Sequence, residues 1–165
     1  MTDAAVVRTV GHGTRSTDEL VELLKAAGVE TLIDVRRFPA GRRQPHLSRD
    51  RLATDLPARG LAYEWWGEAL GGRRSASPGF LAATRWRSSA FAGYAEHMTT
   101  PAFRQALARL EERARSGEAL AVMCAETLWW RCHRRLIADA LVADGLAVEH
   151  LVHGVPGEPH RPSAG

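Results

Sequence analysis

Short apolar segments rich in β-branched residues alternate along the chain with longer segments whose apolar positions repeat every three or four residues. The short segments predict buried strands, and the longer ones predict amphipathic helices. Most of the short segments are continuously hydrophobic, which is typical of a parallel sheet covered on both faces. The predicted strands are Ala5 to Val10, Thr31 to Val35, Leu61 to Trp65, Leu120 to Cys124 and Ala147 to Val152.

Helix start and stop signals lie between these strands. Ser16 and Glu19 form a capping box, and Gly28 ends the helix that begins there. Thr100 followed by Pro101 marks the start of another helix. The other predicted helices run from Ser48 towards Arg59, through Phe91 to Met98, and from Arg131 to Ala143. Strands that alternate with helices predict a doubly wound α/β fold, with a mainly parallel five-stranded sheet and helices on both faces.

The length of 165 residues and the apolar fraction of 45% indicate one globular domain, which we place at residues 1–153. Residues 154–165 hold three of the eight prolines and are expected to be a disordered tail. The segment from Gly67 to Trp86 is too long for an ordinary connection, which predicts a functional or mobile loop. No membrane span is expected, and the lack of a signal-peptide pattern predicts a cytoplasmic location with reduced thiols.

The net charge of +3 hides an uneven distribution of arginine. Between Asp34 and Arg87 the sequence holds 11 Arg against five acidic residues, and the rest of the chain is mildly acidic. This segment favours an anionic partner, although a solvated arginine-rich surface would have the same composition. Its mixture of basic and aromatic residues also resembles surfaces that hold single-stranded nucleic acid. The residues concerned are Arg42, Arg43, Arg73, Arg74, Arg85, Arg87, Trp65, Trp66 and Trp86.

Polar side chains gather where the predicted strands end. In an open α/β sheet, ligands bind beyond the carboxyl ends of the strands, so these side chains are expected to share one crevice. Those expected to carry any reaction are His12, Asp34, Glu126, Cys132 and His133. Those expected to hold a phosphate-containing ligand are Arg15, Arg36, Arg37, Arg131 and Arg134.

The predicted start of the last helix carries unfavourable charge. Arg131 and Arg134 would place positive charge at the positive end of the helix dipole, at a cost of about 0.3–1 kcal/mol each when exposed. Glu126 could compensate this charge within the protein. Alternatively, a bound phosphate or carboxylate could accept the helix N–H groups and the guanidinium donors together. The two arrangements are compatible.

The thiols of Cys124 and Cys132 have three interpretations. They could be small buried hydrophobes, and they could bind a metal together with His133, although this spacing matches no common zinc site, so neither metal nor cofactor is predicted. Cys132 could also be a nucleophile, because a helix N-terminus lowers a thiol pKa. The phosphatase spacing of Cys and Arg fails by one residue, since Trp130 stands where the Arg would be needed.

Several blocks together resemble the signature of domain-of-unknown-function family 488. They are Gly11-His12, Asp34 through Pro39, Leu70-Gly71-Gly72, and Cys124-Ala125-Glu126 followed by Cys132-His133-Arg134. The likeness spans His12 to about Val152 and implies a small cytoplasmic α/β protein, but it names no reaction. The family often has Ser, Ser and Pro where this sequence has Gly13, Gly41 and Trp129.

The preferred hypothesis is a domain that binds an anionic ligand, a nucleotide or a nucleic acid, with a hydrolase or transferase activity assisted by the Cys, His and Glu side chains. The alternative is a non-enzymatic binding or interaction protein. In that case the cluster of Cys124, Glu126, Cys132, His133 and Arg134 is a structural network. The residues alone do not decide whether the protein is an enzyme.

Overall fold

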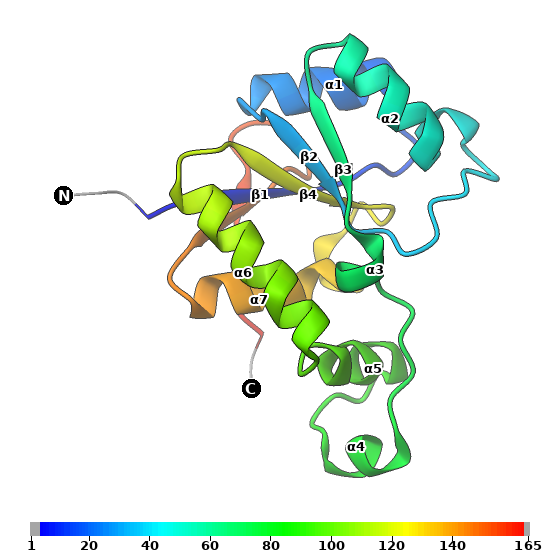
Figure 1. Cartoon of the computed structure of the whole chain (residues 1–165), viewed down its shortest axis with the longest axis vertical. Helices are drawn as coiled ribbons and strands as arrows, with labels where there is room; N and C mark the ends of the chain where they lie inside the picture. Colours follow the sequence, from blue (N-terminus) through cyan, green and yellow to red (C-terminus); the bar gives the residue numbers. More distant parts are fainter. Residues whose placement is uncertain (1–3, 164–165) are drawn as a thin grey trace.

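A computed structural model describes residues 4–163 and contains one six-stranded sheet in the order β3-β2-β4-β1-β5-β6 (Figure 1). The first five strands are parallel and only β6 is antiparallel. The prediction of a mainly parallel α/β sheet is therefore confirmed, with one short strand added. The strands are β1 (Val6–Gly11), β2 (Thr31–Asp34), β3 (Ala62–Trp65), β4 (Leu120–Cys124), β5 (Ala147–His150) and β6 (Glu158–Pro159).

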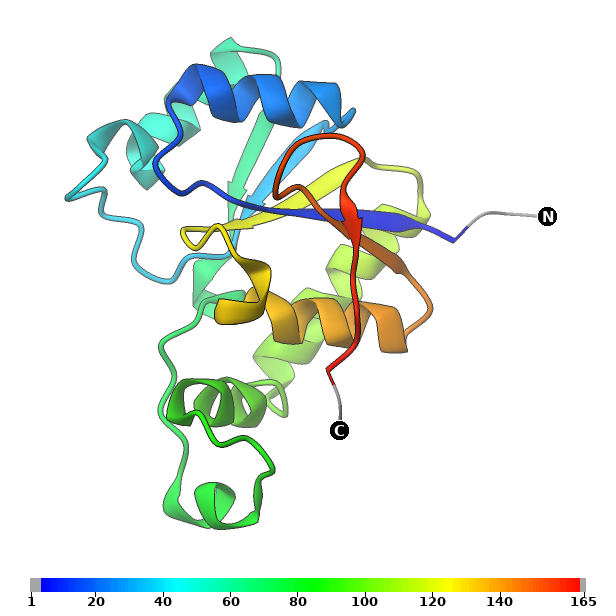
Figure 2. The ribbon, with the colours of Figure 1, turned by 180° about the vertical axis from the view of Figure 1, so that it is seen from behind.

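Helices cover both faces of the sheet (Figures 1 and 2). One core packs α1 (Thr17–Ala26) and α2 (Arg49–Ala58) on one face, and a second core packs α6 (Pro101–Arg115) and α7 (Arg134–Ala143) on the other. The shorter helices are α3 (Gly67–Leu70), α4 (Pro78–Ala83) and α5 (Ser89–His97), and the 3-10 turns are η1 (Pro45–Leu47) and η2 (Trp129–Arg131). No helix in the described chain is long and apolar enough to cross a membrane.

The predicted helix caps are confirmed, whereas the start of the last helix was predicted three residues too early. The hydroxyl of Ser16 accepts the N–H of Glu19, whose carboxylate accepts the N–H of Ser16. The last helix begins at Arg134 because Cys132 is extended, with φ −131° and ψ 168°, and separates η2 from α7. The predicted long loop from Gly67 to Trp86 contains α3 and α4, and α4 projects with α5 away from the sheet (Figure 1).

The sheet order creates a crevice at the carboxyl ends of β1, β4 and β2. The chain leaves β1 and β2 towards α1 and α2 on one face, but it leaves β4 towards α7 on the other face. Since β4 lies between β1 and β2, loops that diverge to opposite faces begin side by side. This is the place where open α/β sheets bind ligands.

Residues 154–163, expected as a disordered tail, pack against the sheet instead (Figure 2). A buried polar chain explains the difference. The ring of His160 links the ring of His150 (2.9 Å) to the carboxylate of Asp139 (2.7 Å), and His150 also contacts the hydroxyl of Thr9. Trp129 stacks on His150 at 4.4 Å between ring centroids. Proline content indicated disorder, but hydrogen bonds from His160 to His150 and from His160 and Ser163 to Asp139 hold the segment in place.

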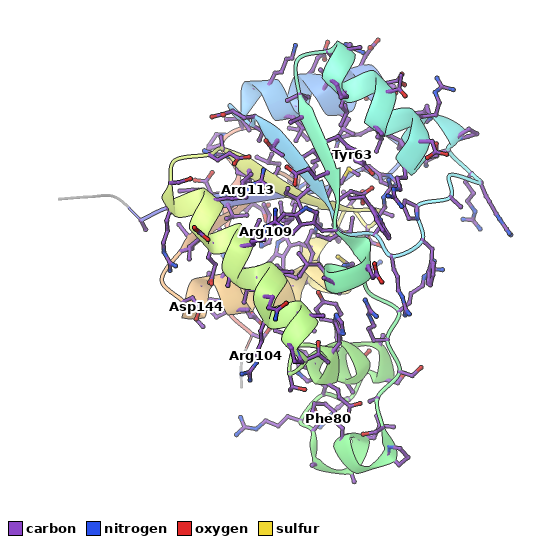
Figure 3. All side chains as sticks on the ribbon, viewed as in Figure 1. Tyr63, Phe80, Arg104, Arg109, Arg113 and Asp144 are labelled. Atoms are coloured by element: carbon purple, nitrogen blue, oxygen red, sulfur yellow. The ribbon has the colours of Figure 1, made fainter. Side chains whose placement is uncertain are left out.

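Figure 3 shows Arg109 and Arg113 on α6, beside the edge strand β3. Arg113 donates to the carboxylates of Glu64 in β3 and Glu118, at 2.6 to 3.0 Å, and both guanidinium groups stack on Trp66. Trp66 thus packs between α6 and the sheet. This packing role differs from the nucleic-acid contact that its position among arginines suggested.

Candidate functional site

Two adjoining cavities of about 660 and 220 Å³ open at the carboxyl ends of β1, β2 and β4. They share Arg36, Phe38, Arg73 and Ala125 as a common wall. The larger cavity is lined by the loops after β1 and β2, and the smaller one reaches the loop after β4. The larger cavity is also lined by His12, Arg42 and Arg43. The smaller one is also lined by Arg37, Gly72, Cys124, Glu126, Cys132 and His133.

Arg36 is held in a fixed orientation by Asp34, which is fully buried at the end of β2. Its Nε and Nη2 donate to the two carboxylate oxygens at 2.9 and 2.7 Å, in the bidentate geometry that suits a guanidinium and a carboxylate. The hydroxyl of Tyr63 in β3 (Figure 3) donates to the same carboxylate. Burial and the charge of Asp34 raise the pKa of Tyr63, so this hydroxyl stays protonated. Asp34 therefore positions Arg36 and does not face the cavities.

His12 is a neutral residue of the cavity wall. Its Nδ1 lies 2.9 Å from the carbonyl oxygen of Gly13 and must donate to it, so Nε2 carries the lone pair. That nitrogen accepts from Nη1 of Arg36 at 3.2 Å. Burial and the charge of Arg36 lower the pKa of His12 despite the hydrogen bond to Gly13. Arg36 is thus fixed from two sides, with its remaining surface towards the cavities.

An exposed aromatic ring lies at the junction of the two cavities. Phe38 is 61% exposed, and the guanidinium groups of Arg37 and Arg73 lie 5.0 and 5.9 Å from its ring centroid. Arg73 has a φ of +58°, an unusual backbone conformation for a residue with a side chain, and its carbonyl accepts from Nη1 of Arg37. Strained conformations of this kind concentrate at binding sites.

The electrostatic character of the two cavities is strongly positive. Five arginines line them, namely Arg36, Arg37, Arg42, Arg43 and Arg73, against a single carboxylate, Glu126. That carboxylate accepts the N–H of Leu128 at 3.2 Å. The wall therefore concentrates cationic side chains around the two cavities.

The two thiols meet in the smaller cavity. Sγ of Cys124, at the end of β4, lies 2.9 Å from Sγ of Cys132, just before α7. The N–H of Arg134 donates to Sγ of Cys132 at 3.3 Å, and the buried guanidinium donates to the backbone carbonyls of Glu126 and Thr127. These carbonyls, and not the carboxylate of Glu126, therefore accept the guanidinium donors.

His133 closes the smaller cavity beside the thiols. Its Nε2 donates to the carbonyl of Val35 at 3.0 Å, which leaves Nδ1 without a proton, and its ring packs 5.0 Å from that of Tyr94. Burial lowers the pKa of His133 to about 4. The residue is therefore a neutral imidazole at physiological pH.

The structure brings together most, but not all, of the residues predicted for the site. His12, Arg36, Arg37, Cys124, Glu126, Cys132 and His133 line the two cavities, and Asp34 lies directly beneath Arg36. Three predicted ligand-binding arginines do not line them. Arg15 donates to the backbone carbonyls of Gly11 and Val152, Arg134 is buried, and Arg131 is exposed on η2.

Two contributors were missed by sequence reasoning. Phe38 directly follows Arg36 and Arg37, and this aromatic residue beside two arginines is the signal that could have found it. Tyr63 lies in the middle of β3, and nothing in the sequence indicates that its hydroxyl reaches Asp34. Of the basic residues expected to hold nucleic acid, Arg42, Arg43 and Arg73 do line a cavity, whereas Arg74 donates to the carbonyls of Gly71 and Glu68.

The close approach of β1 to the loop after β4 requires glycine at position 11. A Cβ on Gly11 would collide with the carbonyl group of Glu126, the same group that accepts from Arg134. We expect Gly11→Ala to lower the free energy of unfolding by roughly 1–3 kcal/mol, because the loop must move. Chemical denaturation measures this change.

Gly79→Ala is the matched control, since a Cβ at Gly79 in α4 would meet no atom within 4 Å. This variant should be neutral or slightly more stable, because alanine favours a helix over glycine. Equal stability of the two variants would contradict the close contact at Gly11.

Comparison with known proteins identifies a family but no individual relative. No curated protein and no solved structure matches this chain. A family model described as "Domain of unknown function DUF488" matches residues 16–141, which hold all the cavity-lining residues named above except His12. The match covers well over half of the chain, and it confirms the resemblance inferred from the signature blocks. This chain therefore belongs to the DUF488 family.

Proposed function

We propose that the protein binds a phosphate-bearing ligand, a nucleotide or a single-stranded nucleic acid, in the two adjoining cavities. The observation that carries this proposal is the wall of five arginines, in which Arg36 is oriented by Asp34 before any ligand arrives. A guanidinium held in place loses little freedom when it binds a phosphate oxygen, and its planar donors suit that geometry.

The size and the aromatic rim of the site favour a ligand that carries a base. A cavity of about 660 Å³ falls within the range of about 300–1,000 Å³ that small-molecule sites occupy. The side chain of Phe38 is largely exposed between the cavities, beside the guanidinium group of Arg37, and a base can stack there while the arginines hold its phosphates. Because stacking does not read sequence, the proposed recognition is of phosphate and aromatic base, with little sequence preference.

A hydrolase or transferase reaction on the bound phosphate ester is a second candidate function. The specific observation in its favour is the position of His133, a neutral imidazole beside Glu126 and Cys132 on the wall of the smaller cavity. Nδ1 of His133 can accept a proton from an attacking group. Release of free phosphate from a bound nucleotide distinguishes this catalyst from the alternative, a non-enzymatic binding protein.

Binding is tested with a fluorescein-labelled single-stranded oligonucleotide and, separately, with ATP. We expect affinity to fall as salt rises, because arginine contacts release counterions from the oligonucleotide. Phe38→Ala should weaken binding by about 1–3 kcal/mol if one base stacks there. Fluorescence anisotropy and calorimetry measure the two dissociation constants, and ATP binding alone would identify the ligand as a mononucleotide.

The control for Phe38 is Leu81→Ala in α4, another exposed apolar side chain, which lies outside both cavities. This variant should bind as the parent does. Equal effects of the two substitutions, or affinity that is independent of salt, would contradict the proposed site.

A further inference from the structure

The chain contains only two cysteines, and the fold brings them into contact. Cys124 ends a central strand and is 3% exposed, whereas Cys132 is half-buried before α7. Both line the cavity of about 220 Å³. The contact therefore combines a buried sulfur, a more accessible sulfur and a route from solvent.

A buried positive charge beside the thiols lacks a carboxylate partner within residues 4–163. The side chain of Arg134 is fully buried, its Nη2 donates to two neutral carbonyls, and its Nε has no hydrogen-bond partner. An unpaired buried charge is costly, so a negative group is expected nearby. A thiolate of the cysteine pair is such a group, and the carboxylate of Glu126 lines the same cavity.

The electrostatics of the pair agree with this assignment. Burial and the charge of Glu126 oppose ionisation of Cys124, but the S–H of Cys132 and the charge of Arg134 lower its pKa. Burial and the adjacent Cys124 raise the pKa of Cys132, which therefore keeps its proton and donates it to the neighbouring sulfur. A thiolate beside a thiol at contact distance is the arrangement from which thiol–disulfide exchange proceeds.

We propose that Cys124 and Cys132 form a dithiol–disulfide exchange site whose co-substrates are small disulfides bearing carboxylates. The two sulfurs lie 2.9 Å apart, so closing the bond to about 2.05 Å requires a shift of under about 1 Å. Arg36, Arg37 and Arg73 line the same cavity and select an anionic disulfide over a neutral one.

The exchange proceeds in two balanced steps. One cysteine thiolate attacks a sulfur of the small disulfide, which forms a mixed disulfide and releases the first small thiolate. The second cysteine then attacks the protein sulfur of this mixed disulfide, so that the internal disulfide forms and a second small thiolate leaves. The small disulfide is reduced and the cysteine pair is oxidised. The single proton of the thiolate–thiol pair ends on one released thiolate, and solvent protonates the other.

The proposal is tested by treating the folded, reduced chain with oxidised glutathione at neutral pH. We expect both free thiols to disappear, with a mass loss of about 2 Da and no lasting glutathione adduct. In Cys124→Ser and Cys132→Ser the second step is blocked, so at least one variant should retain one glutathione. A neutral disulfide, bis(2-hydroxyethyl) disulfide, should react roughly tenfold more slowly, and salt should reduce this difference.

The role of Arg134 is tested by measuring the rate of alkylation by iodoacetamide at a series of pH values, first in the parent chain and then in two variants. The reaction should titrate with a midpoint below the value of about 8.5 for a free thiol. Arg134→Lys, which keeps the positive charge, should preserve this midpoint, whereas Arg134→Met should raise it. Two thiols that stay free in the folded chain, or that oxidise only in denaturant, would overturn the proposal. Failure of the oligonucleotide to bind would not, because the exchange is measured from the thiols and the mass change and does not depend on nucleic-acid binding.

Discussion

Replacement of Arg36 by methionine is expected to lower the free energy of unfolding by roughly 3–5 kcal/mol, because it leaves a buried carboxylate without its counter-charge. Asp34 is fully buried and accepts from Nε and Nη2 of Arg36, whose own side chain is only 10% exposed. The two neutral hydrogen bonds that would remain, from the Tyr63 hydroxyl and from the backbone N–H of residue 36, cannot replace an ion pair in that environment. Chemical denaturation measures the loss.

Two further variants show whether the buried charge causes this loss. Arg43→Met removes an exposed arginine from the same cavity, and it should change stability by no more than about 0.5 kcal/mol while it weakens oligonucleotide binding. The double variant Asp34→Asn/Arg36→Met should recover part of the stability, because no unpaired charge remains. A stable Arg36→Met variant would show that Asp34 does not depend on this partner.

Acidification from pH 6.5 towards pH 4.5 is expected to destabilise the fold steeply. Burial lowers the pKa of His133 to about 4 and, together with the charge of His160, that of His150 to about 3, while both titrate near 6.5 when unfolded. In this window the unfolded chain binds more protons, so stability is present above pH 6.5 and is lost as pH falls. Two such groups correspond to roughly 2 kcal/mol per pH unit between pH 6 and 5.

Other groups adjust this slope without reversing it. Burial lowers the pKa of His12 and His97, which adds to the loss, and burial raises the pKa of Glu111, which opposes it. Denaturation at a series of pH values measures the sum. Stability that is flat between pH 7 and 5 would contradict the neutral, buried state of the histidines.

The parallel sheet and its helices could be predicted from local patterns, because buried strands and helix caps depend on residues that are close together in the sequence. Leu120 to Cys124 is predicted to the residue, and the Ser16 capping box is present. The last helix and the C-terminal segment could not be placed in the same way. Extended Cys132 and buried His160 owe their positions to contacts with residues distant in sequence or on another element.

The location of the candidate site could be predicted for the same reason that the sheet could, since strand ends determine where polar loops meet. Which arginines line the cavities and which are buried could not be predicted. Arg36 and Arg134 look alike in sequence, yet one faces a cavity and the other is buried against two carbonyls. Contact between Cys124 and Cys132 likewise depends on how far η2 carries the chain before α7 begins.

The position of β1 in the middle of the sheet limits how the chain can be shortened. The family match spans residues 16–141, but β1 (Val6–Gly11) and β5 (Ala147–His150) lie outside it. A fragment cut at those limits would lose the strand that pairs with β4, together with His12 from the cavity wall, and would leave β4 as an exposed hydrophobic edge. An expression fragment that keeps the sheet and the buried hydrogen bonds of His150 and His160 intact must therefore start before Val6 and continue past His160.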